Sequence, residues 1–359
     1  MPKLRTLVIL CISCCTVFVA DAKKSVKPVA DSTYITSYTN DLTLRVFASN
    51  KFNQLRFGDY DNKDKVLYKP NASYNIGLGF NYRWLGLNFG FATPGLNNDN
   101  DKYGRTRRQD VQAIIYQRTM TLNVYLQNFE GYYLANNDIL QTPPAGDLNI
   151  IRSDIHTQHF GLTVDKVLNG RKFSFKSVYA QNEWQKKSSG SVIVGAAFHY
   201  MNIHADSSLI PSDINYPVFA ENQQFNRSYG GYLGVHGGYA HTFVIKEHFF
   251  VMGSLLAGGG INYTKLENEA TGWDKARLGF QLNGTLRLGM GYNSERNYVG
   301  LYFITNLDHR SLPLENAYQQ YETGLIRLAF SRRFTLKPKV ARPINAVLGV
   351  FEFGKKKKG

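Results

Sequence analysis

The feature that most constrains the fold is a two-residue alternation over residues 74–92, YNIGLGFNYRWLGLNFGFA. Large apolar side chains occupy every second position, and Gly and Asn fill most of the places between them. A period of two puts each set on one face of a β-strand. The second face carries small polar residues, whereas a soluble sheet would carry charges and Thr there. The pattern therefore favours a transmembrane β-barrel, apolar toward lipid and polar toward the lumen.

The first 22 residues are typical of a secretory signal. Lys3 and Arg5 precede a 14-residue apolar core over residues 7–20, and Ala20-Asp21-Ala22 fits a cleavage site. That core is too short for a helical membrane span. All three cysteines, Cys11, Cys14 and Cys15, lie inside it, so cleavage leaves a chain without disulfides or thiolate metal sites. We expect an exported protein of the bacterial outer membrane.

No later segment has 18 consecutive apolar residues, and the mean hydropathy is −0.31, which excludes a helical membrane protein. The remaining length predicts an all-β, antiparallel transmembrane barrel of about 12 strands, with 10 to 14 allowed. Short turns are expected on one side of the membrane and long loops on the other. The expected organisation is a signal peptide (1–22), a periplasmic lead-in (23–41), the barrel (42–334) and a C-terminal tail (335–359).

The number of strands between residues 172 and 232 is inconsistent when it is counted from the two ends of the chain. Asn169-Gly170 is a strong hairpin signal, so residues 172–181 are expected to return as a strand with Phe173 and Phe175 in phase. Counting from the N-terminal turns places the irregular segment 202–228 on the periplasmic side. Counting back from Phe334 places the same segment outside the cell. Either one strand in this region is miscounted or the barrel has a periplasmic insert.

The alternation assigns side chains to the two faces of the wall. The lipid-facing candidates are Ile76, Leu78, Phe80, Leu87, Phe89, Leu278, Phe280, Leu282, Leu286 and Leu288. The lumen-facing candidates are Arg277, Arg287, Arg327, Asp110, Gln112, Gln281 and His199. Inward arginines could attract an anion at a constriction. The alternative is that they pair with acidic groups in a packed polar core that plugs the barrel, and the limited diameter favours this alternative.

The net charge of +15 comes from 42 basic and 27 acidic residues. Export makes nucleic acid an improbable partner, so the expected partners are outer-membrane lipid and the phosphates of lipopolysaccharide. Loop basics that could reach such phosphates, depending on their side of the membrane, are Arg105, Arg107, Arg108, Lys186 and Lys187. No protein partner can be named.

Three segments carry a family resemblance: YKPNASYNIGLGFNYRWLGLNFGFA (residues 68–92), GYYL (131–134) and QNEWQKKSSGS (181–191). With them the chain resembles a family of uncharacterised proteins from Bacteroidetes-type bacteria, domain of unknown function 4421. The similarity extends from about residue 33 to about residue 334. It implies a barrel-like outer-membrane protein without an established activity, and it supplies no catalytic or binding residues.

No catalytic or metal-binding motif is evident. His156 and His159 are three residues apart and point to opposite faces of a strand, as do His236 and His241, which are five apart. The run NNDND at residues 97–101 lacks the glycine and glutamate of an EF-hand loop. We therefore expect neither a cofactor nor a metal, and each histidine is interpreted as a polar residue of the wall or lumen.

Three functions remain open. The preferred one is a non-enzymatic barrel that is structural, envelope-associated or a channel for small or apolar solutes. The second is a barrel hydrolase acting on lipids, which would need a Ser–His pair on neighbouring strands. The third is a membrane anchor for surface or periplasmic machinery.

Overall fold

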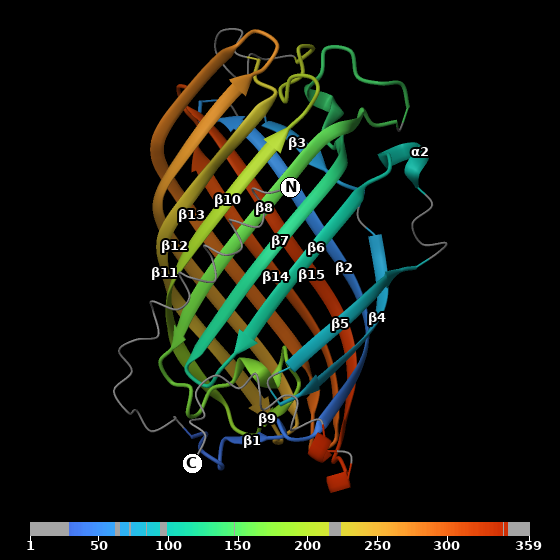
Figure 1. The fold of residues 1–359 in the computed structure, drawn as a ribbon, viewed down its shortest axis with the longest axis vertical. Helices are drawn as coiled ribbons and strands as arrows, with labels where there is room; N and C mark the ends of the chain where they lie inside the picture. Colours follow the sequence, from blue (N-terminus) through green and yellow to red (C-terminus); the bar gives the residue numbers. More distant parts are fainter. Residues whose placement is uncertain are drawn as a thin grey trace.

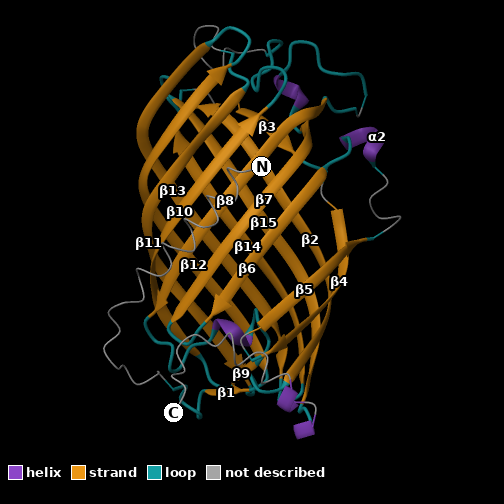
Figure 2. Cartoon of the chain, viewed as in Figure 1, coloured by secondary structure: helices purple, strands orange, loops and turns teal. Residues whose placement is uncertain are grey.

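The structure is a computed structural model that describes residues 29–61, 65–71, 73–83, 85–93, 99–146, 148–214, 224–339 and 341–343. The predicted signal peptide lies outside the described residues, as does most of the predicted C-terminal tail. No helix among the described residues is long and apolar enough to cross a membrane. The fold is instead dominated by long, tilted antiparallel strands that wrap into a barrel (Figures 1 and 2).

The barrel wall is built from strands that mostly follow one another as neighbours. They are β2 (Leu42–Asp59), β3 (Lys65–Lys69), β4 (Ser73–Tyr82), β5 (Leu85–Ala92), β6 (Arg107–Tyr116), β7 (Met120–Leu134), β8 (Ile151–Val167), β10 (Ser189–His204), β11 (Arg227–Ile245), β12 (Phe249–Asn268), β13 (Trp273–Asn293), β14 (Asn297–Ser311) and β15 (Ala317–Phe334). A separate two-stranded sheet pairs β1 (Ile35–Ser37) with β9 (Glu183–Gln185). One short helix, α2 (Asn100–Tyr103), lies beside the wall.

Ten of these strands make a closed ring, and three stand outside it. The ring runs from β7 through β8, β10 and β11 to β15, returns to β2, and closes through the short strand β3. The ring of ten lies within the expected range of 10 to 14, although the central value of about 12 is not matched exactly. The difference arises because β2 is 18 residues long: its first half pairs with β4 and its last residues pair with β3.

The extra strands β4, β5 and β6 leave an interruption in the wall. β5 pairs with β4 and β6 pairs with β7, but β5 and β6 do not pair with each other among the described residues. Figure 1 shows β5 beside β6, and β4 joins β5 to the wall through its pairing with β2. Gly86, Asn88 and Gly90 of β5 are exposed although their phase points inward. Within the described part of the chain, β5 and β6 each have one edge without a neighbouring strand, and we call these two edges the seam.

The predicted strand over residues 172–181 is wrong, and this explains why the two strand counts disagreed. After β8 the chain turns into the barrel, forms a short 3₁₀ helix η2 (Phe175–Ser177), and returns through β9. Phe173 and Phe175 are buried, and they pack inside the barrel end. The two aromatics that suggested strand phase therefore fill the lumen. We call residues 171–185 the plug.

The two ends of the barrel differ in their connections. One end has the brief turns around residues 83, 118, 246 and 295, together with the plug, and we call it the short-turn end. The opposite end has the longer connections, which join β7 to β8 and β10 to β11, and we call it the long-loop end. The described parts of residues 202–228 lie at this end, where β5 also ends and β6 begins, so the two counts no longer conflict.

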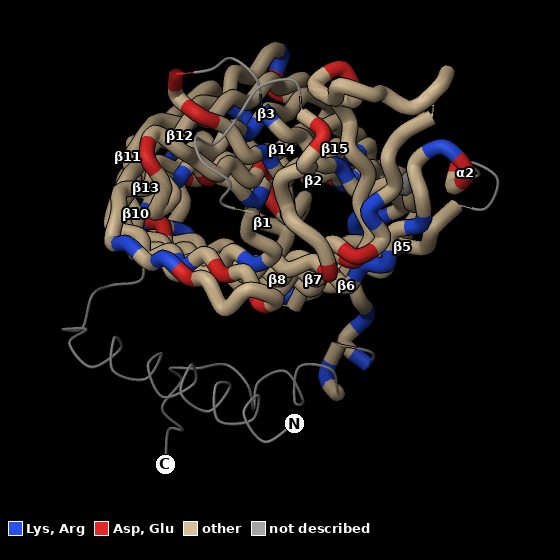
Figure 3. Tube along the Cα trace, turned by 90° about the horizontal axis from the view of Figure 1, so that it is seen from above, with Lys and Arg blue, Asp and Glu red and all other residues tan. Residues whose placement is uncertain are grey.

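Side chains along the wall strands alternate between exposed and buried, as the two-residue period of the sequence predicts. Outward positions of neighbouring strands remain exposed although they are large and apolar, among them Val235 at 67% and Leu278 at 72%. A band of this kind, continuous over several strands, is the surface that a barrel presents to lipid. Figure 3, which looks along the barrel, shows the wall as a ring with acidic and basic positions around it.

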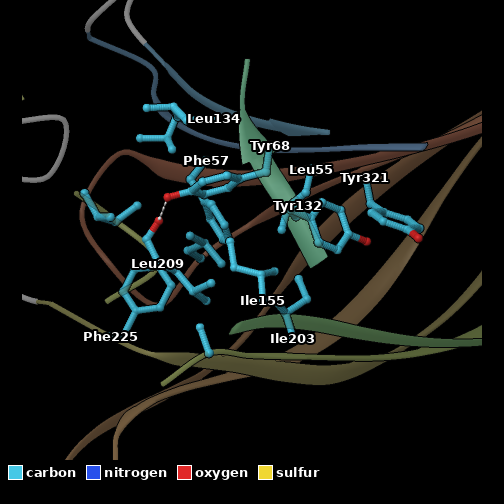
Figure 4. Packing of buried hydrophobic residues seen from close by; sticks show 14 of the residues in the cluster. Leu55, Phe57, Tyr68, Tyr132, Leu134, Ile155, Ile203, Leu209, Phe225 and Tyr321 are labelled. Carbon is cyan, nitrogen blue, oxygen red and sulfur yellow. Dashed lines mark hydrogen bonds between the residues drawn. The ribbon is translucent and has the colours of Figure 1, made fainter. Parts of the chain in front are cut away.

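Two apolar clusters close the interior. At the short-turn end, plug residues such as Phe173, Phe175 and Val178 pack against inward side chains of the wall, including Phe250 and Tyr298. At the long-loop end, a larger cluster combines strand residues with loop residues Leu209 and Phe225. Figure 4 shows this second cluster, in which the Tyr68 hydroxyl donates to the carbonyl of Leu209 at 2.9 Å. The polar part of the lumen lies between the two clusters.

Candidate functional site: a polar layer inside the barrel

Two small cavities in the middle of the lumen, both lined by described residues, share two side chains. The first is lined by His159, His199, Tyr232, Asp308 and Arg310, among others. The second is lined by residues including Asp165, His236, Asn283 and Arg287, and again by His199 and Asp308. The free space in the first amounts to about one water molecule. His199 and Asp308 therefore stand between two polar compartments that are almost filled by side chains.

His159, His199 and Asp308 meet across the width of the lumen. His159 lies on β8, His199 on the neighbouring strand β10, and Asp308 on β14, which is four strands further round the ring. Nδ1 of His199 lies 3.3 Å from Oδ1 of Asp308, and Nε2 of His159 lies 3.8 Å from Oδ2. One ligand-type atom from each residue lies within 4.8 Å of the others. A carboxylate thus reaches from one wall to two imidazoles on the other.

A second acid–histidine pair lies in the other compartment. Nε2 of His236 is 2.6 Å from Oδ1 of Asp165, and the Thr121 hydroxyl donates to Oδ2 of Asp165 at 2.8 Å. Nη2 of Arg287 lies 3.9 Å from the same oxygen. A Cβ atom at Gly195 would lie 2.4 Å from Nε2 of His236, so the absence of a side chain there makes room for the pair.

Several polar atoms around the first cavity have no hydrogen-bond partner within the protein. They include Nδ1 of His159, Oη of Tyr232 and Nη2 of Arg310. These three residues are buried, at 3%, 2% and 5% exposed. Buried polar groups are nearly always satisfied by protein, water or an ion. The first cavity is therefore shaped for a small polar guest of about the size of one water molecule or ion.

The plug is held by a buried network of charges and amides. Glu183 is fully buried and pairs with Arg118, with Lys176 at 3.9 Å, and with the Ser174 hydroxyl at 2.5 Å. Burial lowers the pKa of Lys176, and the nearby carboxylate of Glu183 acts in the opposite direction. The plug is thus tied to the turn before β7 by charge as well as by apolar packing.

A second set of bonds joins the plug to the wall through Gln181, which is fully buried. Arg333 of β15 donates to the Gln181 carbonyl at 2.8 Å and 3.0 Å, and also to Asn293 Oδ1 at 2.8 Å. Arg45 of β2 donates to Gln181 Oε1 at 2.5 Å. The lead-in adds β1, whose Ile35 pairs with Gln185 of β9. The plug is therefore a fixed part of this structure.

The lumen-facing candidates occupy different surroundings. His199, Gln281 and Arg287 line the cavities. Arg327 packs over the Phe47 ring at 4.2 Å, and Asp110 pairs with Lys51 at 2.5 Å.

Two further lumen-facing candidates lie away from that layer. Gln112 is exposed on β6, beside the seam. Arg277 is exposed on β13, beyond the part of the strand that pairs with β14. The candidates therefore do not form one row of inward charges.

The lipid-facing candidates lie on the outer phase of β4, β5 and β13. Eight of them are at least 41% exposed, namely Ile76, Leu78, Leu87, Phe89, Leu278, Phe280, Leu282 and Leu288. Phe80 and Leu286 are half-buried. The loop basics are divided between the ends: Arg105 and Arg107 are exposed at the long-loop end, whereas Lys186 and Lys187 follow β9 at the short-turn end.

Sequence reasoning missed His159, Asp308, Asp165, His236 and Arg310 as site residues. The histidines were compared only with histidines on their own strand, whereas their partners lie on strands distant in sequence. Asp308 and Arg310 were missed because no local motif marks them as inward positions near the end of β14, which continues to Ser311. Asn306, Asp308 and Arg310 are two residues apart, so they share one face of a strand. Extending the two-residue alternation to residue 310 would have identified them.

Comparison with known proteins gives weak structural likenesses. The outer membrane protease OmpT of Escherichia coli is 8% identical and matches 83% of this chain and 98% of its own, with a TM-score of 0.36. The toluene transporter TodX of Pseudomonas putida is 8% identical over 83% and 91%, with a TM-score of 0.24. The outer membrane protein OprG of Pseudomonas aeruginosa is 12% identical over 84% and 98%, with a TM-score of 0.23. Likenesses this weak carry no information about activity or substrate.

No curated protein matches the sequence. A family model does match, over residues 29–326, and its description is a domain of unknown function, DUF4421. The match covers most of the chain, and the chain belongs to this family.

Proposed function

We propose that this member of the DUF4421 family is a non-enzymatic outer-membrane barrel that is closed along its axis. It would serve the cell envelope as a structural or scaffold protein. The observation that carries the proposal is the pair of apolar clusters at the two ends of the lumen. An open pore needs a continuous water path, and side chains block it at both ends.

Location in the outer membrane is supported by the wall and by the sequence. The exposed apolar side chains of β4, β11, β12 and β13 would face the lipid. A predicted signal peptide would deliver the chain to the periplasm. At the long-loop end, Arg105 and Arg107 are placed to meet lipopolysaccharide phosphates, should that end be the outer one.

The size of the internal cavities argues against a lipid hydrolase. The His–Asp pairs lie between the two end clusters, and the space beside them is of the order of single water molecules. An ester or acyl chain would not fit there. Among the described residues, no hydrogen bond joins a serine hydroxyl to a histidine, so the nucleophile–base pair of such enzymes has no counterpart in that part of the chain.

The test combines conductance with chemical access to the lumen. In a background with Cys11, Cys14 and Cys15 changed to Ser, Asn283→Cys puts one thiol beside the second cavity. We expect no resolved conductance steps in planar bilayers and no reaction with a membrane-impermeant thiol reagent. Replacing residues 172–182 by a short Gly-Ser linker should expose the thiol from the short-turn end.

The matched control replaces residues 269–272, an exposed turn at the opposite end, and should leave the thiol protected. Steady conductance by the unmodified barrel, or rapid labelling of Asn283→Cys with the plug in place, would show that the axis is open. The sealed-barrel proposal would then be abandoned.

The seam supports a second candidate, a membrane anchor for another protein. Unpaired strand edges are costly in lipid because no water satisfies their N–H and C=O groups. The inner side of the seam contains the Lys51–Asp110 pair and the Arg45–Asn88 hydrogen bond of 2.6 Å, so it is unsuited to an apolar solute. An added strand from a partner would satisfy both edges.

Photo-crosslinkers at Phe91 and Val111, both exposed on the seam strands, should then capture a discrete polypeptide in native membranes. A crosslinker at Leu278, on the continuous wall, is the control. Equal capture at all three positions would exclude the anchor at the seam. Spontaneous disulfide formation between Asn88→Cys and Gln112→Cys would show that β5 and β6 close on each other, and it would exclude the anchor as well.

A further inference from the structure

We propose that His159, His199 and Asp308 bind one divalent transition-metal ion, of which Zn²⁺ is the representative, in the middle of the closed barrel. This goes beyond the sealed-barrel role, because a barrel can be closed along its axis with or without a metal. It also changes the expectation from the sequence, which gave no metal site. The three residues come from three separate strands, so no local sequence motif predicts them.

The spacing of the three side chains suits a single ion. Zn²⁺ bonds to His nitrogen and carboxylate oxygen are about 2.0–2.2 Å, so ligand atoms in a tetrahedral site lie about 3.4 Å apart. Nδ1 of His199 lies 3.3 Å from Oδ1 of Asp308, and Nε2 of His159 lies 3.8 Å from the other carboxylate oxygen, Oδ2. One ligand atom from each residue lies within 4.8 Å of the others, so side-chain rotations that shorten these separations would bring the three residues to one ion.

The bonding between the three side chains is incomplete. Nδ1 of His199 lies 3.3 Å from Oδ1 of Asp308, which is long for a charge-assisted hydrogen bond. His199 and Asp308 therefore approach each other at a separation that two ligands of one ion would also have. A cation between them would satisfy both groups at once.

The donor set indicates the class of metal. Two imidazoles and one carboxylate suit Zn²⁺ and its first-row neighbours, and they are too few and too nitrogen-rich for Ca²⁺ or Mg²⁺. Three protein ligands leave one position for water. The Tyr125 hydroxyl is 3.3 Å from Nε2 of His159 and would have to release that nitrogen to the metal. The cavity excludes a larger guest, because its free space is about that of one water molecule.

One nearby group opposes a cation. Arg310 is buried and lines the same cavity, so its positive charge weakens metal binding, while the carboxylate of Asp308 favours it. The other charges in this layer, Asp165 and Arg287, lie in the second compartment and contact each other at 3.9 Å. We therefore expect an affinity well below that of a structural zinc site with four thiolate ligands.

The experiment uses the full chain, folded in detergent and stripped with EDTA. Titration with Co²⁺, followed by its visible d–d absorption and by displacement with Zn²⁺, gives stoichiometry and affinity. We expect one equivalent of metal in the wild type. His159→Gln, His199→Gln and Asp308→Asn should each weaken binding by at least the roughly tenfold that loss of an outer-shell partner already costs.

His236→Gln is the matched control, because it changes a lumen histidine of the second pair and should leave metal affinity within about twofold. Heat-modifiable migration on a detergent gel checks that each variant is folded. As a second measurement, Zn²⁺ should raise the unfolding midpoint of the wild type and leave that of Asp308→Asn unchanged. Absence of saturable Co²⁺ binding by the folded wild type, or equal weakening in His236→Gln, would overturn the proposal.

Discussion

The two ends of the lumen are closed in different ways. At the long-loop end, the closing cluster is contributed by many elements, including inward side chains of β2, β3, β7 and β8. At the short-turn end, one segment of the chain folds into the barrel and is held by Arg45, Arg118 and Arg333. The first closure is inseparable from the wall. The second is a local unit that can be loosened without dismantling the barrel.

The largest effect on stability is expected at the long-loop end. Phe57 is fully buried and contacts Phe225 edge-on, with ring centroids 5.5 Å apart. Phe57→Ala should lower the free energy of unfolding by about 3–5 kcal/mol, measured by urea titration in detergent. Labelling of Asn283→Cys from the short-turn end should not increase, because the plug remains. A smaller loss than that of the exposed control Phe249→Ala would mean that this cluster does not support the wall.

The next largest effect is expected from the bonds that hold the plug to β15. Arg333→Met leaves the Gln181 carbonyl without its side-chain donor and removes one of the two side-chain donors to the Glu183 carbonyl, which should cost about 3 kcal/mol in plug docking. Labelling of Asn283→Cys from the short-turn end should accelerate by about a hundredfold, while the unfolding midpoint of the barrel should change less. Arg332→Met, at the exposed neighbour, is the control. Equal labelling rates in Arg333→Met and Arg332→Met would show that the bonds of Arg333 do not hold the plug in the barrel.

A smaller effect is expected from the buried carboxylate of the plug. Glu183→Gln keeps the size of the side chain but removes the charge that pairs with Arg118 and Lys176. Plug docking should weaken by about 2 kcal/mol, seen as faster labelling in the same assay. Glu295→Gln changes an exposed carboxylate on the same end and should have no effect. An unchanged labelling rate in Glu183→Gln would leave the apolar contacts as the main support of the plug.

The smallest effect concerns pH. Burial lowers the pKa of Lys176, so the charged ammonium disfavours the docked plug at every pH below that lowered pKa. This cost is relieved as pH rises from the folded pKa toward the ordinary value of 10.5. The labelling rate should therefore fall over that alkaline window in the wild type. The fall should be absent in Lys176→Met and retained in the exposed control Lys172→Met. A parallel fall in Lys176→Met would assign it to another group.

Much of the barrel could be predicted from local alternation. A strand in a barrel wall has one side toward lipid and one toward the lumen, so each strand carries the two-residue period by itself. The segment around Ile76, Leu78 and Phe89 shows this clearly, and their outward positions are exposed. Phe173 and Phe175 misled the interpretation, because two aromatics in phase look alike whether they line a strand or fill a barrel end.

The sequence by itself determined an all-β chain with alternating faces, short turns and long loops, because these depend on neighbours along the chain. Only the tertiary structure decided that ten strands close the ring, that residues 171–185 enter it, and that Asp308 meets His159 and His199. The physical reason is that ring closure and lumen contacts join residues distant in sequence. The distance across the lumen depends on how all the strands tilt and register together, and no single strand encodes it.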